Sequence, residues 1–84
     1  MRHASNCALD QLDELLIALR QLPGVKEKSR GIFYRGGKAF VHFHEDPGGL
    51  FADARVLEKF ERFRVSTEKE RAAFQKALRR AVAK

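Results

Sequence analysis

The sequence predicts an α+β protein, a two-layer sandwich in which an antiparallel meander of three to four strands carries an N-terminal and a C-terminal helix on one face. Three observations support this prediction. Leucines recur at helical spacing near the N-terminus, glycine-containing turns separate β-rich runs in the middle of the chain, and a capping motif precedes a second helical stripe. The 84 residues are then expected to form one α-β-β-β-β-α domain, residues 1–84, because a chain of this length supports a single small core.

The composition narrows the class of partner without identifying it. The 17 basic and 11 acidic residues give a formal net charge of +6, which favours anionic partners through the long-range field. The single cysteine, Cys7, cannot form an internal disulfide, and the chain shows neither an apolar run of membrane-spanning length nor a signal-peptide pattern. We therefore expect a cytoplasmic protein with no membrane partner.

The first helix is predicted between a polar cap and a Pro-Gly stop. Ser5 and Asn6 are residue types that cap helices, and the leucines that follow recur at spacings of three and four, which places them on one face. Pro23-Gly24 ends the helix. The stripe, which must be buried against the sheet, consists of Leu9, Leu12, Leu15, Leu16, Leu19 and Leu22.

The first hairpin is predicted at Gly36-Gly37, which lies between two β-rich runs. Glycine reaches the positive φ angles that a two-residue hairpin turn requires. If Arg35 pairs with Lys38, then Phe33 lies opposite Phe40. On this register Phe33 and Phe40 are expected on the face that the helices leave open.

A second hairpin is predicted at Asp46–Gly49, where aspartate can accept a hydrogen bond from the following backbone and proline fixes φ. Closing it with Glu45 opposite Leu50 sets His42 against Asp53 on the open face. Strand alternation then gives the expected core face. Its members are Ile32, Tyr34, Val41, Phe43, Leu50, Ala52, Phe63 and Val65.

Two segments are less regular. Residues 25–30 are rich in charge and are expected to form an edge strand or a loop. Residues 56–65 fit a helical stripe and a strand about equally well, so that residues 56–63 can be either; we expect a turn at 57–59 and a short strand at 61–65. That strand points Arg62 and Arg64 to the open face.

The second helix is predicted to begin at Thr67, because Thr67-Glu68-Lys69-Glu70 is a capping box. Acidic residues at its start and basic residues at its end complement the helix dipole, so those charges need no ligand to explain them. Its buried stripe is expected to be Phe74, Ala77, Leu78, Ala81 and Val82.

Three short motifs resemble a known family. They are Leu22-Pro23-Gly24-Val25, Gly36-Gly37-Lys38-Ala39-Phe40 and His42-x-His44-x-Asp46, which look like the small bacterial luciferase-domain proteins. The helix–meander–helix order is also similar to the MmcQ/YjbR-like family, and that resemblance implies a frataxin-like two-layer fold and a DNA-binding role. Neither resemblance transfers a catalytic residue.

The open face is the predicted functional surface. Three phenylalanines on one exposed face are typical of an interface, and basic residues and histidines surround them. The predicted binding residues are Phe33, Phe40, Phe51, His42, His44, Arg55, Arg62 and Arg64.

A pair of histidines raises the question of a metal ion. His42 and His44 place their imidazoles roughly 7 Å apart on one strand face, so that with Asp53 they are candidate metal ligands. The simpler interpretation is polar cover for the sheet, in which His42 pairs with Asp53 and His44 stacks on Phe51. No nucleophile or second catalytic group accompanies them in the sequence, so we predict no catalytic residue and no cofactor.

The sequence therefore favours a non-enzymatic binding or interaction domain that self-associates as a homodimer through its open sheet face. The alternative is a nucleic-acid-binding module, because basic residues interleaved with aromatic ones are the arrangement that holds single strands. A small anionic ligand is a third candidate partner.

Overall fold

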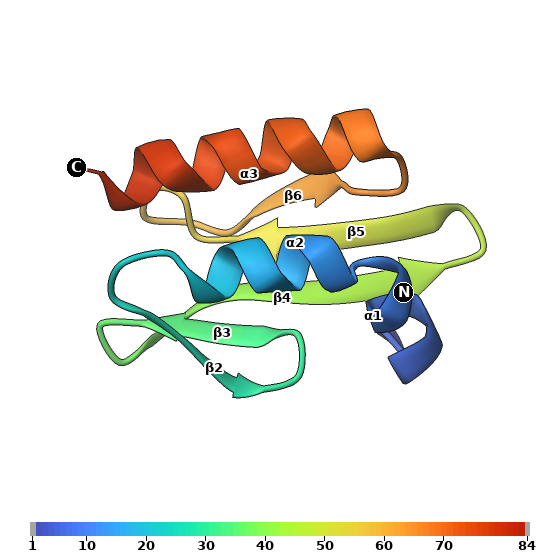
Figure 1. The fold of residues 1–84 in the computed structure, drawn as a ribbon, viewed down its shortest axis with the longest axis horizontal. Coiled ribbons are helices and arrows are strands. Elements are labelled where there is room, and N and C mark those ends of the chain that lie inside the picture. The colour runs from blue at the N-terminus through green and yellow to red at the C-terminus, as the bar shows by residue number, and fades with distance from the viewer. Residues whose placement is uncertain (1, 84) are drawn as a thin grey trace.

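A computed structural model describes residues 2–83 and confirms an antiparallel sheet covered by helices on one face (Figure 1). The strands are ordered β2-β3-β4-β5-β6, and β1 pairs with the far end of β4. The sheet therefore has more strands than the three to four expected. The elements are β1 (Arg2–His3), α1 (Asn6–Gln11), α2 (Asp13–Arg20), β2 (Val25–Ser29), β3 (Ile32–Arg35), β4 (Lys38–Asp46), β5 (Gly49–Ala54), β6 (Glu61–Arg64) and α3 (Glu68–Val82).

The N-terminal helical segment is divided into α1 and α2, where one helix was expected. Ser5 caps α1 as predicted, since its Oγ accepts a hydrogen bond from the backbone N–H of Ala8 at 3.2 Å. At Leu12 the backbone N–H bonds to the carbonyl of Leu9, which tightens the last turn of α1 before α2 begins. The leucine stripe stays intact across the break, and all its members except the half-buried Leu22 are buried.

The second hairpin has the predicted register throughout. Glu45 pairs with Leu50, His42 with Asp53, and the other cross-strand pairs of β4 and β5 follow in step. The turn forms for the expected reason, because Asp46 Oδ1 accepts a hydrogen bond from the N–H of Gly48 at 2.7 Å.

The first hairpin departs from the predicted register just beyond its turn. Arg35 pairs with Lys38 as expected, but Phe33 pairs with Val41, and Phe40 is the extra residue of a β-bulge. A bulge sets two residues of one strand against one of the other, so the alternation of faces in β3 is offset by one residue from the predicted one, while β4 keeps its predicted faces from Val41 onward.

This bulge overturns the expected positions of two phenylalanines. Phe33 is 0 % exposed and Phe40 is 2 % exposed, so both belong to the core and not to the open face. Ile32 and Tyr34, which we expected in the core, are half-buried on the opposite face, where the Lys28 ammonium lies 4.7 Å from the centre of the Tyr34 ring. The extra residue in β4 accounts for all of these corrections: Tyr34 still pairs with Ala39, but Ala39 and Val41 no longer share a face because Phe40 is inserted between them.

The C-terminal part of the chain follows the prediction closely. The strand β6 leaves Arg62 and Arg64 exposed, while Val65 just after it is fully buried. Thr67 and Glu70 form the predicted capping box, with both reciprocal hydrogen bonds present. Of the expected α3 stripe, Phe74, Leu78 and Ala81 are buried and Ala77 and Val82 are half-buried.

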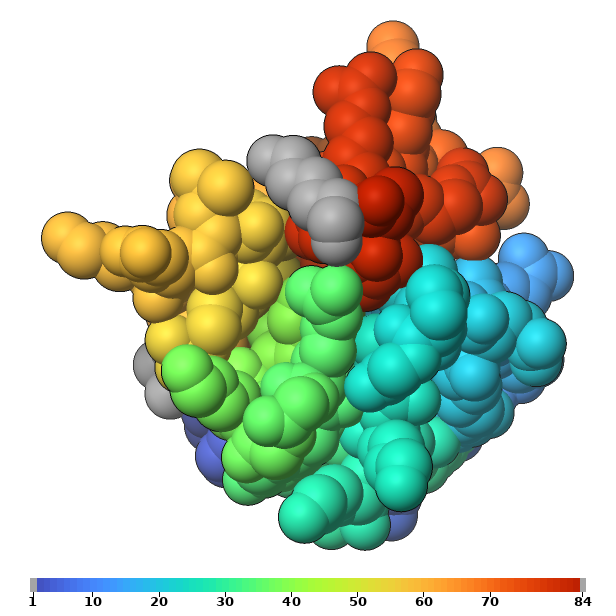
Figure 2. All heavy atoms as spheres, turned by 90° about the vertical axis from the view of Figure 1, so that its left-hand side faces the viewer, coloured from blue at the N-terminus to red at the C-terminus, as the bar shows by residue number. Residues whose placement is uncertain are grey.

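The core lies between the sheet and the layer formed by α2 and α3, which run along the same face of the sheet (Figure 1). The loop between β5 and β6 projects away from these helices, as the gold segment in Figure 2 shows. Since both helices lie on one face, no helix within residues 2–83 covers the opposite face of the sheet. Within residues 2–83, no helix is both long and apolar enough to cross a membrane.

A half-buried carboxylate joins the helix layer to the β2–β3 turn. Glu27 accepts hydrogen bonds from the Arg20 guanidinium, with Nη2 3.1 Å from Oε2, and from the backbone N–H of Gly31 at 2.9 Å. Gly31 has φ +81°, and a Cβ there would lie 2.7 Å from Leu9 Cδ2, so the turn requires glycine. The Arg20 hydrogen bond is the largest of the effects that lower the pKa of Glu27.

The corrected face of Phe33 can be tested by stability. We expect Phe33→Ala to lower the free energy of unfolding by about 3 to 5 kcal/mol, because it leaves a cavity in the core. Phe60→Ala is the control, since Phe60 is 39 % exposed and should cost much less. Urea unfolding of both variants measures the two losses of stability. Equal and small losses would mean that Phe33 lies on the surface and not in the core.

The Glu27 contacts predict a pH dependence of stability. Because the folded pKa of Glu27 lies below its unfolded value, its stabilisation is complete above the ordinary carboxyl pKa and is lost as pH falls through the lowered one. We expect Glu27→Gln to cost up to about 1 kcal/mol near neutral pH and progressively less in acid. Urea unfolding over a pH series measures this, with the exposed Glu58→Gln as control. A constant difference at all pH values would contradict it.

Candidate metal centre on the open sheet face

The structure divides the predicted binding residues into three groups. Phe33 and Phe40 lie in the core, and Arg55 lies just after β5 at one end of the sheet. The remaining predicted residues keep their places on the open face. These are His42, His44, Phe51, Arg62 and Arg64.

Cross-strand pairing brings the polar side chains of the open face together. His42 and Asp53 are directly opposite in β4 and β5, and Asp53 is opposite Arg62 in β6. His44 lies two residues from His42 on the same face. The strand β1 adds His3 beside His44. Four strands therefore contribute to one cluster of histidine, aspartate and arginine side chains.

Three ligand-type atoms converge at the centre of this cluster. His42 Nδ1 lies 2.8 Å from His44 Nε2, and His44 Nε2 lies 3.1 Å from Asp53 Oδ2. One such atom from each residue lies within 4.8 Å of the other two. The side chains of His44 and Asp53 are only 15 % and 14 % exposed, so both are shielded without being fully buried.

The two close contacts among these three atoms cannot both be full hydrogen bonds, because too few of the atoms carry a hydrogen. An imidazole nitrogen either carries one hydrogen or offers one lone pair, and an ionised carboxylate oxygen only accepts. A single proton at His44 Nε2 must be shared between His42 Nδ1 and Asp53 Oδ2, while a proton at His42 Nδ1 leaves His44 Nε2 facing the carboxylate with a lone pair. Neither tautomer satisfies both contacts fully, whereas a cation placed among the three atoms would.

Arg62 holds the carboxylate of Asp53 in place. Its Nε donates to Asp53 Oδ1 at 2.8 Å and its Nη2 donates to Oδ2 at 3.0 Å. This bidentate pair is the main reason that the pKa of Asp53 is lowered, so the carboxylate is ionised at neutral pH. The side chain of Asp53 is therefore both charged and fixed in orientation.

His42 is kept in its neutral form. Burial is the largest effect that lowers its pKa, and the neighbouring His44 adds to it. A neutral imidazole retains the lone pair that a metal ion or a hydrogen-bond donor needs.

Two aromatic neighbours that the sequence did not indicate enclose the cluster. The His3 ring stacks on His44 with centroids 5.3 Å apart, and Phe60 meets the His42 ring edge-on at 5.1 Å. The Arg55 guanidinium lies over the Phe60 ring, 4.5 Å from its centre. Phe60 was in the segment predicted as turn and strand, and no periodic pattern marked His3.

The polar-cover interpretation differs from the observed contacts. It paired His42 with Asp53 through their side chains, but the short contact of Asp53 is with His44. The aromatic neighbours of His44 in residues 2–83 are His3 and His42, and not Phe51 as expected. The histidines are therefore gathered around one point and not spread across the sheet.

Comparison with known proteins adds no relative to this picture, since no family model, no curated protein and no solved structure matches the chain. The resemblance to luciferase-domain and MmcQ/YjbR-like proteins accordingly stays a prediction. What can be said of function rests on the geometry of the side chains.

Proposed function

We propose that this protein is a small binding domain whose open sheet face holds a divalent transition-metal ion through His42, His44 and Asp53. The observation that supports the proposal is the approach of their ligand atoms to within 4.8 Å of one another. Two imidazole nitrogens and one carboxylate oxygen form a donor set suited to Zn²⁺ and related ions.

The separations suit a metal ion without a change of fold. Bonds of about 2.0 to 2.2 Å to one ion place neighbouring ligand atoms about 3 to 3.5 Å apart. The 2.8 Å and 3.1 Å separations are close to that range, and the third is no more than 4.8 Å, so rotations of the side chains can bring all three atoms to one ion. Three protein ligands leave at least one coordination position for water or for a donor atom of a partner.

Arg62 has two opposing effects on such a site. Its bidentate contact orients Asp53, as hydrogen bonds to metal ligands commonly do. Its positive charge, however, repels the ion and offsets the charge of the carboxylate. We therefore expect affinity in the micromolar range and not the tighter binding of a closed structural zinc site.

Metal titration tests the proposal directly. We expect Zn²⁺ and Co²⁺ to bind with one site per chain, to raise the melting temperature, and for Co²⁺ to give visible absorption bands. His42→Ala and His44→Ala should each weaken binding at least ~10-fold, because each removes a ligand. Isothermal titration calorimetry measures the affinities.

His3→Ala provides a matched control for this titration. Its ring stacks on His44 but lies outside the group of three ligand atoms, so we expect little change in affinity. If His3→Ala abolishes binding while His42→Ala leaves it unchanged, the assignment of the ligands is wrong. Absence of binding to the wild type at ~100 μM metal would remove the proposal altogether.

Nucleic-acid binding through the same face has weaker support. Arg62 is paired with Asp53, and Arg64 Nε lies 3.4 Å from a carboxylate oxygen of Glu70. Two of the three phenylalanines expected to stack on bases are buried in the core. Both the phosphate contacts and the stacking surface are therefore reduced relative to the sequence-based expectation.

Self-association is the second candidate function, with a different centre from the one predicted. The large apolar side chains left exposed in the loop after β5 are Leu57, at 69 %, and Phe60, at 39 %. Neighbouring exposed apolar side chains favour a protein contact at this loop. The dimer expected from the sequence was centred on Phe33, Phe40 and Phe51. Phe33 and Phe40 are buried in the core, so they cannot contribute to its interface.

Sedimentation equilibrium tests the self-association. We expect the wild type to form dimers at ~100 μM and Leu57→Ser to weaken dimerisation by roughly tenfold or more, which is about 1.4 kcal/mol. Ile17→Ser is a matched control, because Ile17 is an exposed apolar residue, at 48 %, on the helix α2. A wild-type monomer, or equal effects of the two substitutions, would contradict this candidate.

A further inference from the structure

A second site, which shares no residue with the three proposed metal ligands, lies at one end of the sheet. Here the α2–β2 turn, the β3–β4 turn, the loop after β5 and the last turn of α3 enclose a pocket of about 670 Å³. Figure 2 looks onto this end, with residues 35–40 in green between the gold loop and the red end of α3. The lining residues are Pro23, Gly24, Arg35, Gly36, Lys38, Ala39, Phe40, Arg55, Leu57 and Val82.

The charge of the pocket has one sign. Arg35, Lys38 and Arg55 all line it, and among residues 2–83 no acidic residue does. Three like charges around one partly enclosed volume repel one another and create a positive potential inside it. An anion in the pocket removes that repulsion, whereas water only screens it.

Arg55 is fixed in position before any ligand binds. Its Nε donates to the carbonyl of Ala39 at 3.1 Å and its Nη1 donates to the carbonyl of Glu58 at 2.9 Å. Neither acceptor is a carboxylate, so the charge of Arg55 is positioned without being neutralised. A guanidinium has five N–H donors, which leaves three for a ligand.

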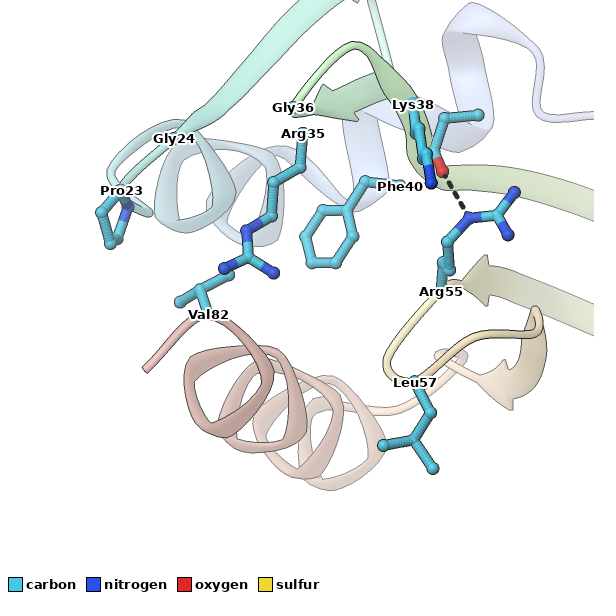
Figure 3. A pocket seen from close by; sticks show the side chains of 10 residues that line it. Pro23, Gly24, Arg35, Gly36, Lys38, Phe40, Arg55, Leu57 and Val82 are labelled. Atoms are coloured by element: carbon cyan, nitrogen blue, oxygen red, sulfur yellow. Dashed lines mark hydrogen bonds between the residues drawn. The ribbon is translucent and has the colours of Figure 1, made fainter. Parts of the chain in front are cut away.

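Arg35 is held differently. Within residues 2–83, no hydrogen bond or ion pair engages its guanidinium, which lies 5.9 Å from the centre of the Phe40 ring. Figure 3 shows Arg35 reaching past Phe40 toward Val82, with Lys38 and Arg55 on the other side of the ring. The C-terminal end of α3 attracts one positive charge through its dipole. The helix dipole does not account for the three positive charges that line the pocket.

The remaining wall of the pocket is apolar. Phe40 forms its floor, and Leu57, Val82 and Pro23 surround it. Ligand pockets generally combine such a wall with a few fixed polar groups, and this volume falls within their usual range. An inorganic ion would use the cations and leave the apolar wall in contact with water.

From this combination we propose that the pocket binds a small organic anion, a carboxylate or phosphate monoester attached to an aromatic or short aliphatic body. The charged group lies among Arg35, Lys38 and Arg55, and the body packs on Phe40 and Leu57. The site does not require a metal ion, and it stands or falls independently of the metal proposal.

Phenyl phosphate is the probe for the first experiment, in a buffer with chelator so that no metal ion can hold the phosphate. Titration into ¹⁵N-labelled protein should shift the backbone resonances of Gly24, Gly36 and Ala39, and inorganic phosphate should bind at least ~10-fold more weakly because it cannot use the apolar wall. Equal binding of the two probes, or shifts centred on the histidines of β4, would overturn the proposal.

Substitutions separate a ligand site from a structural role. Arg35→Gln should weaken phenyl phosphate binding at least ~10-fold, because a charge-assisted contact is lost. Arg64→Gln, an exposed arginine on the open face, is the matched control and should leave binding unchanged. Equal effects of the two substitutions would mean that only the net charge matters, which contradicts a specific pocket.

Stability without ligand gives a second readout. If the three cations repel one another, Arg35→Gln and Lys38→Gln should leave the melting temperature unchanged or raise it, and phenyl phosphate should stabilise the wild type more than either variant. A lowered melting temperature in both variants without ligand would assign these side chains a structural role and overturn the proposal.

Discussion

The β-bulge at Phe40 is the constraint on which the arrangement of this protein depends. Because Phe33 pairs with Val41 and the bulge leaves Phe40 unpaired, the adjacent residues Phe40 and Val41 are both buried. Beyond the bulge, β3 turns Phe33 into the core and leaves Ile32 and Tyr34 on the other face. A regular hairpin would have put Phe33 and Phe40 on the open face and Ile32 and Tyr34 in the core, so the bulge exchanges these two pairs of side chains between the faces.

The pairing of β4 with β5 was predictable, and that of β3 with β4 was only partly so. In the second hairpin, the Asp46–Gly49 turn sets the register and strict alternation of side chains maintains it. In the first hairpin, Gly36-Gly37 sets the two pairs nearest the turn, but the run Ile32-Phe33-Tyr34 is apolar at every position. A run without alternation does not indicate which of its side chains face the core. Packing against the helix layer determines which of them are buried.

The same reasoning explains how much of the candidate site could be predicted. His42, His44 and Asp53 follow from alternation and from the β4–β5 register alone, and they lie together as that register requires. His3 and Phe60 could not be found, because a two-residue strand and an irregular loop carry no periodic pattern. Their positions depend on tertiary contacts, the pairing of β1 with β4 and the folding of the loop back onto His42.

The bulge also connects the two surfaces for which we propose ligands. By turning Phe40 inward, it provides the apolar floor of the pocket between Arg35, Lys38 and Arg55. Beyond the bulge, His42 keeps its regular pairing with Asp53 and therefore stays on the open face. The two surfaces differ in charge pairing: Asp53 pairs with Arg62 on the open face, whereas no acidic residue in the described part of the chain lines the pocket. The converging lone pairs of His42, His44 and Asp53 suit a cation at the first surface despite the charge of Arg62, and the cations of the pocket, which are unpaired within residues 2–83, suit an anion at the second, although the net charge of +6 would suggest anions for both.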